Sequence, residues 1–320
     1  MTKEFQGFKW ADMVDAQEKN LTMDKKLIIT VCPTGALFAR KHNPNQPYTP
    51  REIANDVIGA YQEGASMAHL HTRREDGKFG APHQVLKEVI DMILDKCPDM
   101  IIQPSACESF IPGTTNYSYE SVKPMVEIMK ERKYMESTIF TPVSYAAEMS
   151  DGEIGLSIAA EDNTQKTIKF LQDRKIKPEF MNHTWEGIQN VREWLIKPGI
   201  LDKPYLMSMG PGMHNTGDTY PDPWGLMYVM GMMKMMPKGS VVSMSAGGRN
   251  WLALSNFAIL MGCDGVRIGM EDHLWMYPHK DEKIKRSADE AKKIATIARE
   301  LGREIATPAQ ARRIMGIYKD

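Results

Sequence analysis

Two histidines, two positions apart, are the first candidates for chemistry in this chain. The segment His69-Leu70-His71-Thr72-Arg73 closes the run 65–68, which is typical of a short buried strand. Because side chains on a strand alternate between its two faces, His69, His71 and Arg73 should point the same way. Two imidazoles on a rigid strand can bind one metal ion. The alternative is a pair of surface histidines, since an H-x-H pair alone does not decide between them.

The composition of the chain excludes several classes of protein. The chain has 320 residues and a formal net charge of -1, which argues against binding to nucleic acid or to an acidic membrane surface. Residues 1–24 are polar and mixed in charge, so they indicate an N-terminal extension and neither a signal peptide nor a membrane anchor. Residues 25–320 are expected to form one catalytic domain. The cysteines have no CxxC spacing and indicate reduced thiols and a cytoplasmic location: Cys32, Cys97, Cys107 and Cys263.

Short apolar runs alternate regularly with longer amphipathic segments, which predicts alternating strands and helices. Eight strands are expected, at 27–32, 66–71, 100–105, 137–141, 178–182, 205–209, 240–244 and 265–269. Eight helices are expected between and after them, at 50–63, 83–96, 118–132, 162–174, 185–197, 222–236, 249–261 and 282–301. Three tetrapeptides have the pattern of a capping box at the start of a helix, although Ser287 could instead lie inside the longer helix expected at 282–301: Thr49-Pro50-Arg51-Glu52, Ser287-Ala288-Asp289-Glu290 and Thr307-Pro308-Ala309-Gln310.

Eight strand–helix units in one chain of this size predict an α/β fold, the (β/α)8 TIM barrel, with C-terminal helices. A doubly wound open sheet is the alternative. In a barrel, the chemistry lies at the C-terminal ends of the strands and in the loops that follow. Polar residues of this chain meet that demand at the second, third, fourth, fifth and eighth strands: His69, His71, Arg73, Ser105, Thr141, Glu179, Arg267, Glu271 and Asp272.

The acids after the last strand are the second candidate cluster. A glycine-containing turn can bring Glu271 and Asp272 over the barrel mouth, beside the first two strands. Glu271 can then complete a His-His-carboxylate set, which with an open position suits catalytic zinc better than structural zinc. Asp272 alone is also explained as a helix cap, and Arg267 beside it as a structural ion pair.

Taken together, several segments of the chain resemble the β-keto acid cleavage enzyme family. They are Thr34-Gly35-Ala36, Pro47-Tyr48-Thr49-Pro50, 69–73 and 266–272, with 305–308 and Arg312 towards the C-terminus. The resemblance implies a zinc-dependent barrel that exchanges acyl groups between a β-keto acid and acetyl-CoA. The products would be acetoacetate and a new acyl-CoA. It also implies a homotetramer.

The resemblance assigns roles to individual residues. It implies that the metal ligands are His69, His71 and Glu271, and that the catalytic groups are Arg267, Asp272 and, on the fifth strand, Glu179. Substrate-binding positions fall on Ser105, Thr141 and Leu37, and Arg73 is expected with them. In a family member that binds a substrate ammonium, an acid stands where this chain has Leu37. Because a leucine cannot pair with an ammonium, a cationic substrate is not expected here.

The expected chemistry begins with removal of the C2 proton of the β-keto acid, for which Asp272 beside Arg267 is the candidate base. The enolate then attacks acetyl-CoA, and the CoA thiolate attacks the original keto carbon. Ser105 and Thr141 would orient the substrate, although either can instead cap the helix after its strand. Two other functions stay open: a zinc-dependent aldolase or hydrolase on the same fold, and a barrel that binds a CoA ester without turning it over.

Overall fold

The computed structural model describes residues 21–106, 115–150, 152, 154–211 and 223–317. Within this part of the chain, no helix combines the length and the apolar character needed to cross a bilayer. Cys107 of the sequence analysis lies outside the described residues.

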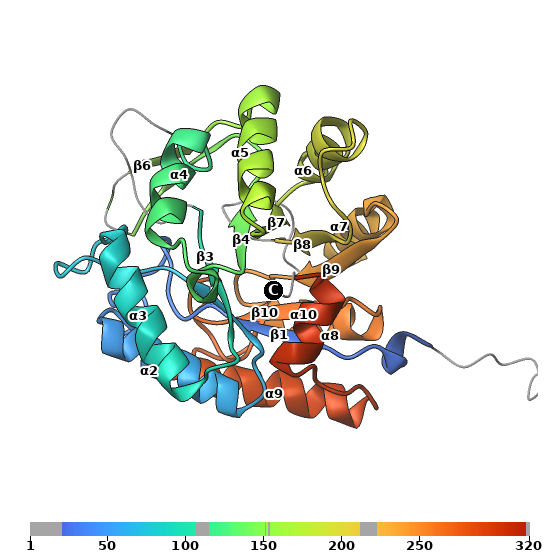
Figure 1. Cartoon of the computed structure of the whole chain (residues 1–320). Coiled ribbons are helices and arrows are strands. Elements are labelled where there is room, and N and C mark those ends of the chain that lie inside the picture. Colours follow the sequence, from blue (N-terminus) through green and yellow to red (C-terminus); the bar gives the residue numbers. More distant parts are fainter. Residues whose placement is uncertain (1–20, 107–114, 151, 153, 212–222, 318–320) are drawn as a thin grey trace, which may run out of the picture.

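Eight parallel strands form a closed barrel in the order β3-β2-β1-β10-β9-β8-β7-β4 (Figure 1). Their bounds are β1 (Ile28–Val31), β2 (Met67–Leu70), β3 (Ile101–Pro104), β4 (Ser137–Phe140), β7 (Lys177–Asn182), β8 (Tyr205–Met209), β9 (Ser240–Met244) and β10 (Gly265–Ile268). The ring closes between β3 and β4, where Ser105 pairs in parallel with Ile139 and the Ile102 carbonyl accepts the Glu136 N–H at 3.0 Å. The predicted barrel is confirmed, and the open sheet is excluded because this sheet has no free edge.

Helices surround the strands at each position where one was expected (Figure 1). They are α2 (Pro50–Gln62), α3 (His83–Lys96), α4 (Tyr119–Ile128), α5 (Glu161–Asp173), α6 (Trp185–Asn190), α7 (Pro223–Met235), α8 (Trp251–Leu260) and α9 (Ser287–Glu300). Helix α6 continues as a turn of π-helix, η3 (Val191–Ile196), and α9 begins five residues later than the predicted start at 282.

Two of the three predicted capping boxes are confirmed. Thr49 and Thr307 each accept an N–H from the residue three positions on, and that residue's side chain returns the bond. The capping box at Ser287 was wrong, since Arg286 precedes the helix and Ser287 is its first residue. The Ser287 N–H is bound by the Asp56 carboxylate of α2 at 3.0 Å, so a neighbouring helix supplies this cap.

A short antiparallel hairpin after β4 was not expected from the sequence. It consists of β5 (Tyr145–Glu148) and β6 (Ile154–Ser157). Two short 3₁₀ turns, η1 (Leu21–Asp24) and η2 (Arg132–Tyr134), are further additions.

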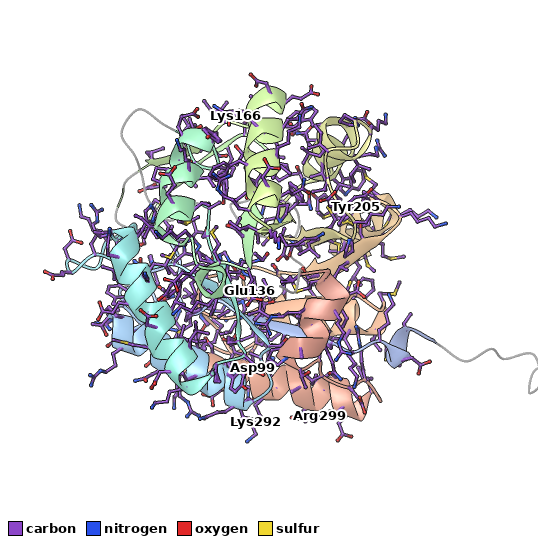
Figure 2. All side chains as sticks on the ribbon, in the orientation of Figure 1. Asp99, Glu136, Lys166, Tyr205, Lys292 and Arg299 are labelled. Carbon is purple, nitrogen blue, oxygen red and sulfur yellow. The ribbon has the colours of Figure 1, made fainter. Side chains whose placement is uncertain are left out.

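Helix α10 (Pro308–Met315) closes the N-terminal end of the barrel, which faces the viewer in Figure 1. Side chains at the starts of four strands pack there with Ala311 and Met315 of α10 in a separate apolar cluster: Ile28, Met67, Ile101 and Leu206. Arg312 binds both oxygens of Glu136 at 2.6 and 2.7 Å, near the centre of this end in Figure 2. The opposite end is therefore the one open to chemistry.

Candidate active site

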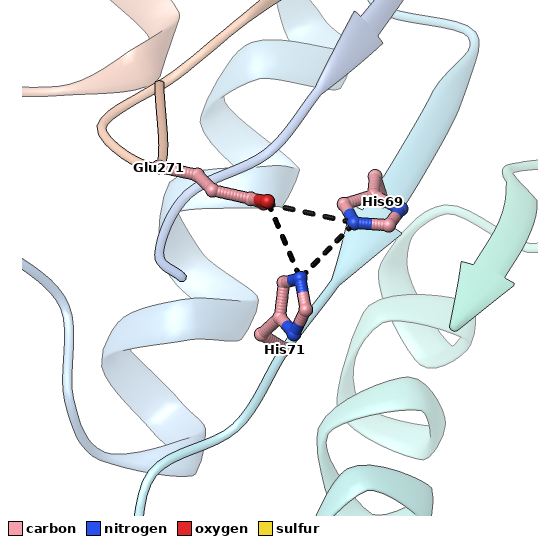
Figure 3. A group of neighbouring side chains, drawn as sticks. All are labelled: His69, His71 and Glu271. Atoms are coloured by element: carbon pink, nitrogen blue, oxygen red, sulfur yellow. Dashed lines mark hydrogen bonds and ion pairs between the residues drawn. The ribbon is translucent and has the colours of Figure 1, made fainter. Parts of the chain in front are cut away.

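Three side chains that could together hold a metal ion meet at the C-terminal end of the barrel, as Figure 3 shows. His69 lies on β2, His71 directly follows it, and Glu271 comes from the turn after β10. The Nε2 atoms of the two histidines are 3.2 Å apart, and His71 Nε2 is 3.3 Å from Glu271 Oε1. His69 Nε2 is 3.7 Å from Glu271 Oε2. All three side chains are buried, and their ligand atoms lie within 4.8 Å of one another.

Hydrogen bonding fixes the tautomer of His69 as a metal ligand requires. Gln103 of β3 donates its amide N–H groups to Glu179 at 2.7 Å and to Ser137 at 3.0 Å, so its oxygen faces His69. That oxygen accepts a hydrogen bond from the Nδ1–H of His69 at 3.0 Å. The proton is therefore on Nδ1, and Nε2 has a free lone pair that can bind a metal. Burial and the charge of Arg267 lower the pKa of His69 well below its ordinary value, so the ring is neutral.

The residues therefore fit a divalent metal. Among the described residues, the buried Oε2 of Glu271 has no hydrogen-bond partner, which a cation in the triad would supply. Burial opposes ionisation of Glu271, but Arg267 and the two histidines outweigh it and bring the pKa of this carboxyl well below its ordinary value. His69, His71 and the ionised Glu271 together form a His-His-carboxylate set, which is typical of catalytic zinc.

Two glycines allow Glu271 to reach the histidines. Gly269 has φ +129°, and a Cβ there would collide with the Cys32 carbonyl. That carbonyl accepts the Glu271 N–H at 3.3 Å, which fixes the turn. A Cβ on Gly35 would overlap the Glu271 side chain itself. The glycines of the Thr34-Gly35-Ala36 turn and of the β10 turn are thus needed for close approach.

A buried ion pair lies against the triad. Arg267 binds Asp272 through Nε and Nη2, both at 2.8 Å, and Nη2 also lies 2.6 Å from Glu271 Oε1. Burial, together with the charge of Glu271, raises the pKa of Asp272 despite Arg267. The Cys32 thiol lies 3.2 Å from Arg267 Nε and 3.4 Å from Asp272 Oδ2. Burial raises the pKa of this thiol well above its ordinary value, so it is a neutral neighbour.

Glu179 points into the barrel interior below the triad. Its carboxylate accepts hydrogen bonds from Gln103 at 2.7 Å and from Ser243 of β9 at 3.1 Å. Burial raises the pKa of Glu179, although these hydrogen bonds and Arg267 act in the other direction. Through Gln103, this carboxylate is connected to the metal ligand His69.

A small pocket opens over the triad. Its described lining joins the metal-binding residues and Arg267 to a second wall made by Ser105, Tyr117, Ile139, Thr141, Met181 and His183. Ser105 and Thr141, predicted to bind substrate, thus lie in the pocket with the predicted ligands. Asp272 is bonded to a residue of the lining, Arg267, and is outside the lining itself.

Arg73 and Leu37 do not belong to this described lining. The Arg73 guanidinium binds Thr34 Oγ1 at 3.1 Å, the Gly77 carbonyl at 3.0 Å and the carbonyls of Gly35 and Phe38. It therefore holds the loop that contains Leu37, which is half-buried.

Sequence reasoning missed four of the residues that complete this site. They are Gln103, Cys32, Met181 and His183, and of these Gln103 and Cys32 belong to no motif of the sequence. A usable signal existed on β7, because Glu179, Met181 and His183 are two positions apart and so share one face of the strand.

Comparisons with known proteins bear on this geometry. The family model "beta-keto acid cleavage enzyme" matches residues 26–317. The 3-keto-5-aminohexanoate cleavage enzyme of Fusobacterium nucleatum subsp. nucleatum is 31% identical over 297 residues, 93% of this chain and 100% of that protein. The 3,5-dioxohexanoate:acetyl-CoA acetone transferase of Paraburkholderia graminis is 26% identical over 317 residues, 91% of this chain and 96% of that protein. Among solved structures, the ternary complex of ObcA with a C4-CoA adduct and oxalate has a TM-score of 0.69 at 17% identity, over 85% of this chain and 68% of that one. This likeness shows the shared fold.

Proposed function

Because the chain belongs to the β-keto acid cleavage enzyme family, we propose that it condenses a β-keto acid with acetyl-CoA and releases acetoacetate and a new acyl-CoA. One observation carries the proposal: a His-His-Glu triad and Arg267 line one pocket at the C-terminal end of the barrel, and Asp272 is paired with Arg267 directly behind the lining. This combination offers a metal site next to a base and a cation, which is what enolate chemistry needs.

His69, His71 and Glu271 would hold the metal, which we propose to be zinc. When bound, zinc would polarise the keto group and make the C2 proton more acidic. The remaining steps belong to residues of the chain. Arg267 lines the pocket and stabilises the negative charge that develops on the substrate.

We assign removal of the C2 proton to Asp272. Its raised pKa makes it a stronger base than an ordinary aspartate. A substrate carboxylate in the pocket competes with Asp272 for Arg267, and the oxygen that this frees is the proposed proton acceptor. Glu179, with its own raised pKa, assists from the floor of the barrel through Gln103. Ser105 and Thr141 are placed to orient the substrate carboxylate.

The surroundings of the Leu37 loop support a substrate with a neutral tail. Leu37 cannot neutralise an ammonium. Arg40, the nearest cation in sequence, turns to Glu52, whose oxygens it binds at 2.7 and 2.8 Å, and stacks on Tyr48. Arg40 is thus already paired and lies outside the pocket lining. For Arg73 we propose an indirect role in substrate binding, through the loop that it holds.

The wider organisation is also proposed. We expect residues 25–320 to act as one catalytic domain after an extension at 1–24, in a cytoplasmic homotetramer. The described cysteines are buried free thiols, as suits a reducing compartment. Exposed apolar side chains on α7 and at the end of α8 support association between subunits: Met227, Met230, Leu260 and Met261. Light scattering of the purified protein would measure the number of subunits.

The test of the activity is a coupled assay for acetoacetate with zinc-loaded protein and a panel of β-keto acids. We expect acetoacetate only when acetyl-CoA is present, with one acyl-CoA formed for each acetoacetate. Cleavage without acetyl-CoA would instead indicate an aldolase or a hydrolase. Binding of acetyl-CoA without any turnover would indicate a non-catalytic barrel.

A further inference from the structure

His183 is a pocket residue to which the chemistry above gives no task. It follows β7 and lies four positions after Glu179 and two after Met181, so all three share the interior face of the barrel wall. Glu179 lies lowest, and His183 lies at the mouth. The His183 side chain is buried and lines the same pocket as His69, His71 and Arg267.

Three separate elements hold His183 in place. The Gly210 carbonyl after β8 lies 3.3 Å from His183 Nδ1. The Tyr145 ring of β5 packs edge-on against the imidazole with ring centres 6.2 Å apart. The hydroxyl of Tyr228 on α7 donates a hydrogen bond to the backbone carbonyl of His183 at 3.2 Å. The imidazole is thus oriented by Gly210 and Tyr145 and the backbone beneath it is fixed by Tyr228, the kind of support that a functional side chain needs.

The bond to Gly210 also settles which nitrogen can act. A carbonyl oxygen only accepts, so Nδ1 carries a proton, and the nitrogen that can exchange protons with a reactant is Nε2. The same carbonyl stabilises the ring in its protonated form. Gly210 makes this possible, since a Cβ there would lie 2.9 Å from His183 Nδ1 and 2.8 Å from Met181 Sδ.

His183 follows β7, which is three strands away from β10 in the order of the barrel, so His183 and the β10 turn belong to different parts of the pocket wall. Gly210 and Pro211 belong to the loop after β8, and the Pro211 carbonyl accepts the N–H of Gly247 after β9 at 3.0 Å. Gly210 has no side chain that would stand between its backbone and His183. A thioester can approach closely there while the β-keto acid occupies the side of Arg267 and the triad.

We propose that His183 is a further catalytic residue, the acid–base group for the sulfur of CoA; the proposal rests on the function proposed above. When the enolate carbon attacks the acetyl carbonyl, the carbon–sulfur bond breaks and its electron pair stays on sulfur. The His183 imidazolium donates the Nε2 proton to this sulfur, giving CoA thiol and neutral imidazole. In the second half of the reaction, Nε2 takes the proton back as sulfur attacks the original keto carbon. The bond from that carbon to C2 then breaks, and C2 leaves as the enolate of acetoacetate, which takes back the proton held by Asp272.

The experiment separates sulfur chemistry from enolate formation. In H183N the short amide can still donate to Gly210, but no group can exchange a proton at the position of Nε2. We expect kcat for acetyl-CoA-dependent acetoacetate formation to fall by about 10² to 10³, as for loss of a positioned acid–base group. The KM for acetyl-CoA and the zinc content should stay within about threefold of the wild type, the margin left to an unmoved binding site. Exchange of the C2 protons for deuterium, measured by NMR with the β-keto acid and without acetyl-CoA, should keep the wild-type rate.

Three controls make each outcome decisive. H183Q keeps a polar atom near Nε2 but cannot transfer a proton, so it carries the same test if H183N does not fold. H279N changes an exposed histidine outside the pocket and should leave every rate unchanged. Turnover of H183N within about threefold of the wild type, or equal loss of turnover and C2 exchange, would overturn the proposal. Absence of both activities in the wild-type protein would instead contradict the proposed function itself.

Discussion

At the scale of single residues, the metal ligands are the assignments with the clearest consequence. Replacing His69 or His71 with alanine removes one of three ligand atoms that lie within 4.8 Å of one another. We expect the protein to lose bound zinc and acetoacetate formation together, because two remaining ligands do not hold a catalytic zinc. Metal analysis after dialysis, in parallel with the activity assay, measures both. The variant H279A is the matched control. Full zinc occupancy in H69A would remove His69 from the ligand set.

Replacing Asp272 tests the proposed general base and leaves the three metal ligands in place. The variant D272N keeps the size of the side chain and one oxygen for Arg267, but it cannot accept a proton. We expect turnover to fall by about 10² to 10⁴, the usual range for a positioned base. Zinc content should be unchanged, since Asp272 is outside the triad. Near-normal turnover would show that Asp272 only positions Arg267.

We expect Leu37 to determine which charge the substrate tail can have. Desolvating an ammonium against leucine without a partner is costly, so kcat/KM should favour a neutral tail by at least about tenfold, or about 1.4 kcal/mol. Comparison of 3-oxohexanoate, 3-oxoadipate and 3-keto-5-aminohexanoate tests this order. Because Arg40 is already paired with Glu52, we also expect 3-oxoadipate to rank below 3-oxohexanoate.

The variant L37E should improve the amino substrate, whereas the isosteric L37Q should not. A highest kcat/KM for 3-keto-5-aminohexanoate in the wild-type protein would refute the assignment of Leu37.

At the scale of elements, the turn after β10 positions the carboxylate of the triad. The variant G269A places a Cβ against the Cys32 carbonyl in a backbone with φ +129°. The turn must shift, so we expect zinc affinity to fall at least about tenfold although no ligand is removed, as when the groups that orient a ligand are lost. Competition with a chromogenic chelator measures the affinity.

G302A is the control for this turn, because Gly302 also has a positive φ, +84°, but has open space around it. This variant should lose about 1 kcal/mol of stability from backbone strain and keep its zinc. Equal zinc affinity in G269A and wild type would show that the turn is not what places Glu271.

The elements themselves were largely predictable, for a physical reason. A barrel strand is buried on both sides and lies between helices, so its short apolar run stands out in the sequence. All eight were found within two residues of their ends. The π-helix at Val191–Ile196 was not found, since apolar spacing barely distinguishes it from an α-helix. The β5–β6 hairpin was missed because the apolar residues of β6 face solvent instead of the core, with Ile154 63% exposed.

The site was predictable only where one motif contained several functional residues. His69 and His71 are two positions apart at the end of β2, and Glu271 and Asp272 closely follow Arg267 of β10, so two short segments contained both groups. Gln103 was not predicted from the sequence, because its role depends on contacts with His69 and Glu179 that form only when the barrel folds.

At the scale of the whole molecule, the two ends of the barrel have opposite tasks. The end covered by α10 is filled with apolar side chains and contributes stability. The other end buries the charged side chains of Arg267, Glu271 and Asp272. Removing these charges from water lowers the free energy of unfolding, and their ion pairs compensate for only part of that loss. A bound metal would offset that cost, because it binds the folded barrel and not the unfolded chain.

Zinc should therefore raise the free energy of unfolding. At a free zinc concentration of 100 times Kd, mass action predicts an increase of about 2.7 kcal/mol. Urea unfolding with zinc and with a chelator measures the increase as a shift of the midpoint at unchanged slope. The variant H71A, which lacks one ligand atom of the triad, should show almost no shift. An equal shift of the midpoint in H71A and wild type would mean that zinc stabilises the protein by binding at another place, and that the triad is not the zinc site.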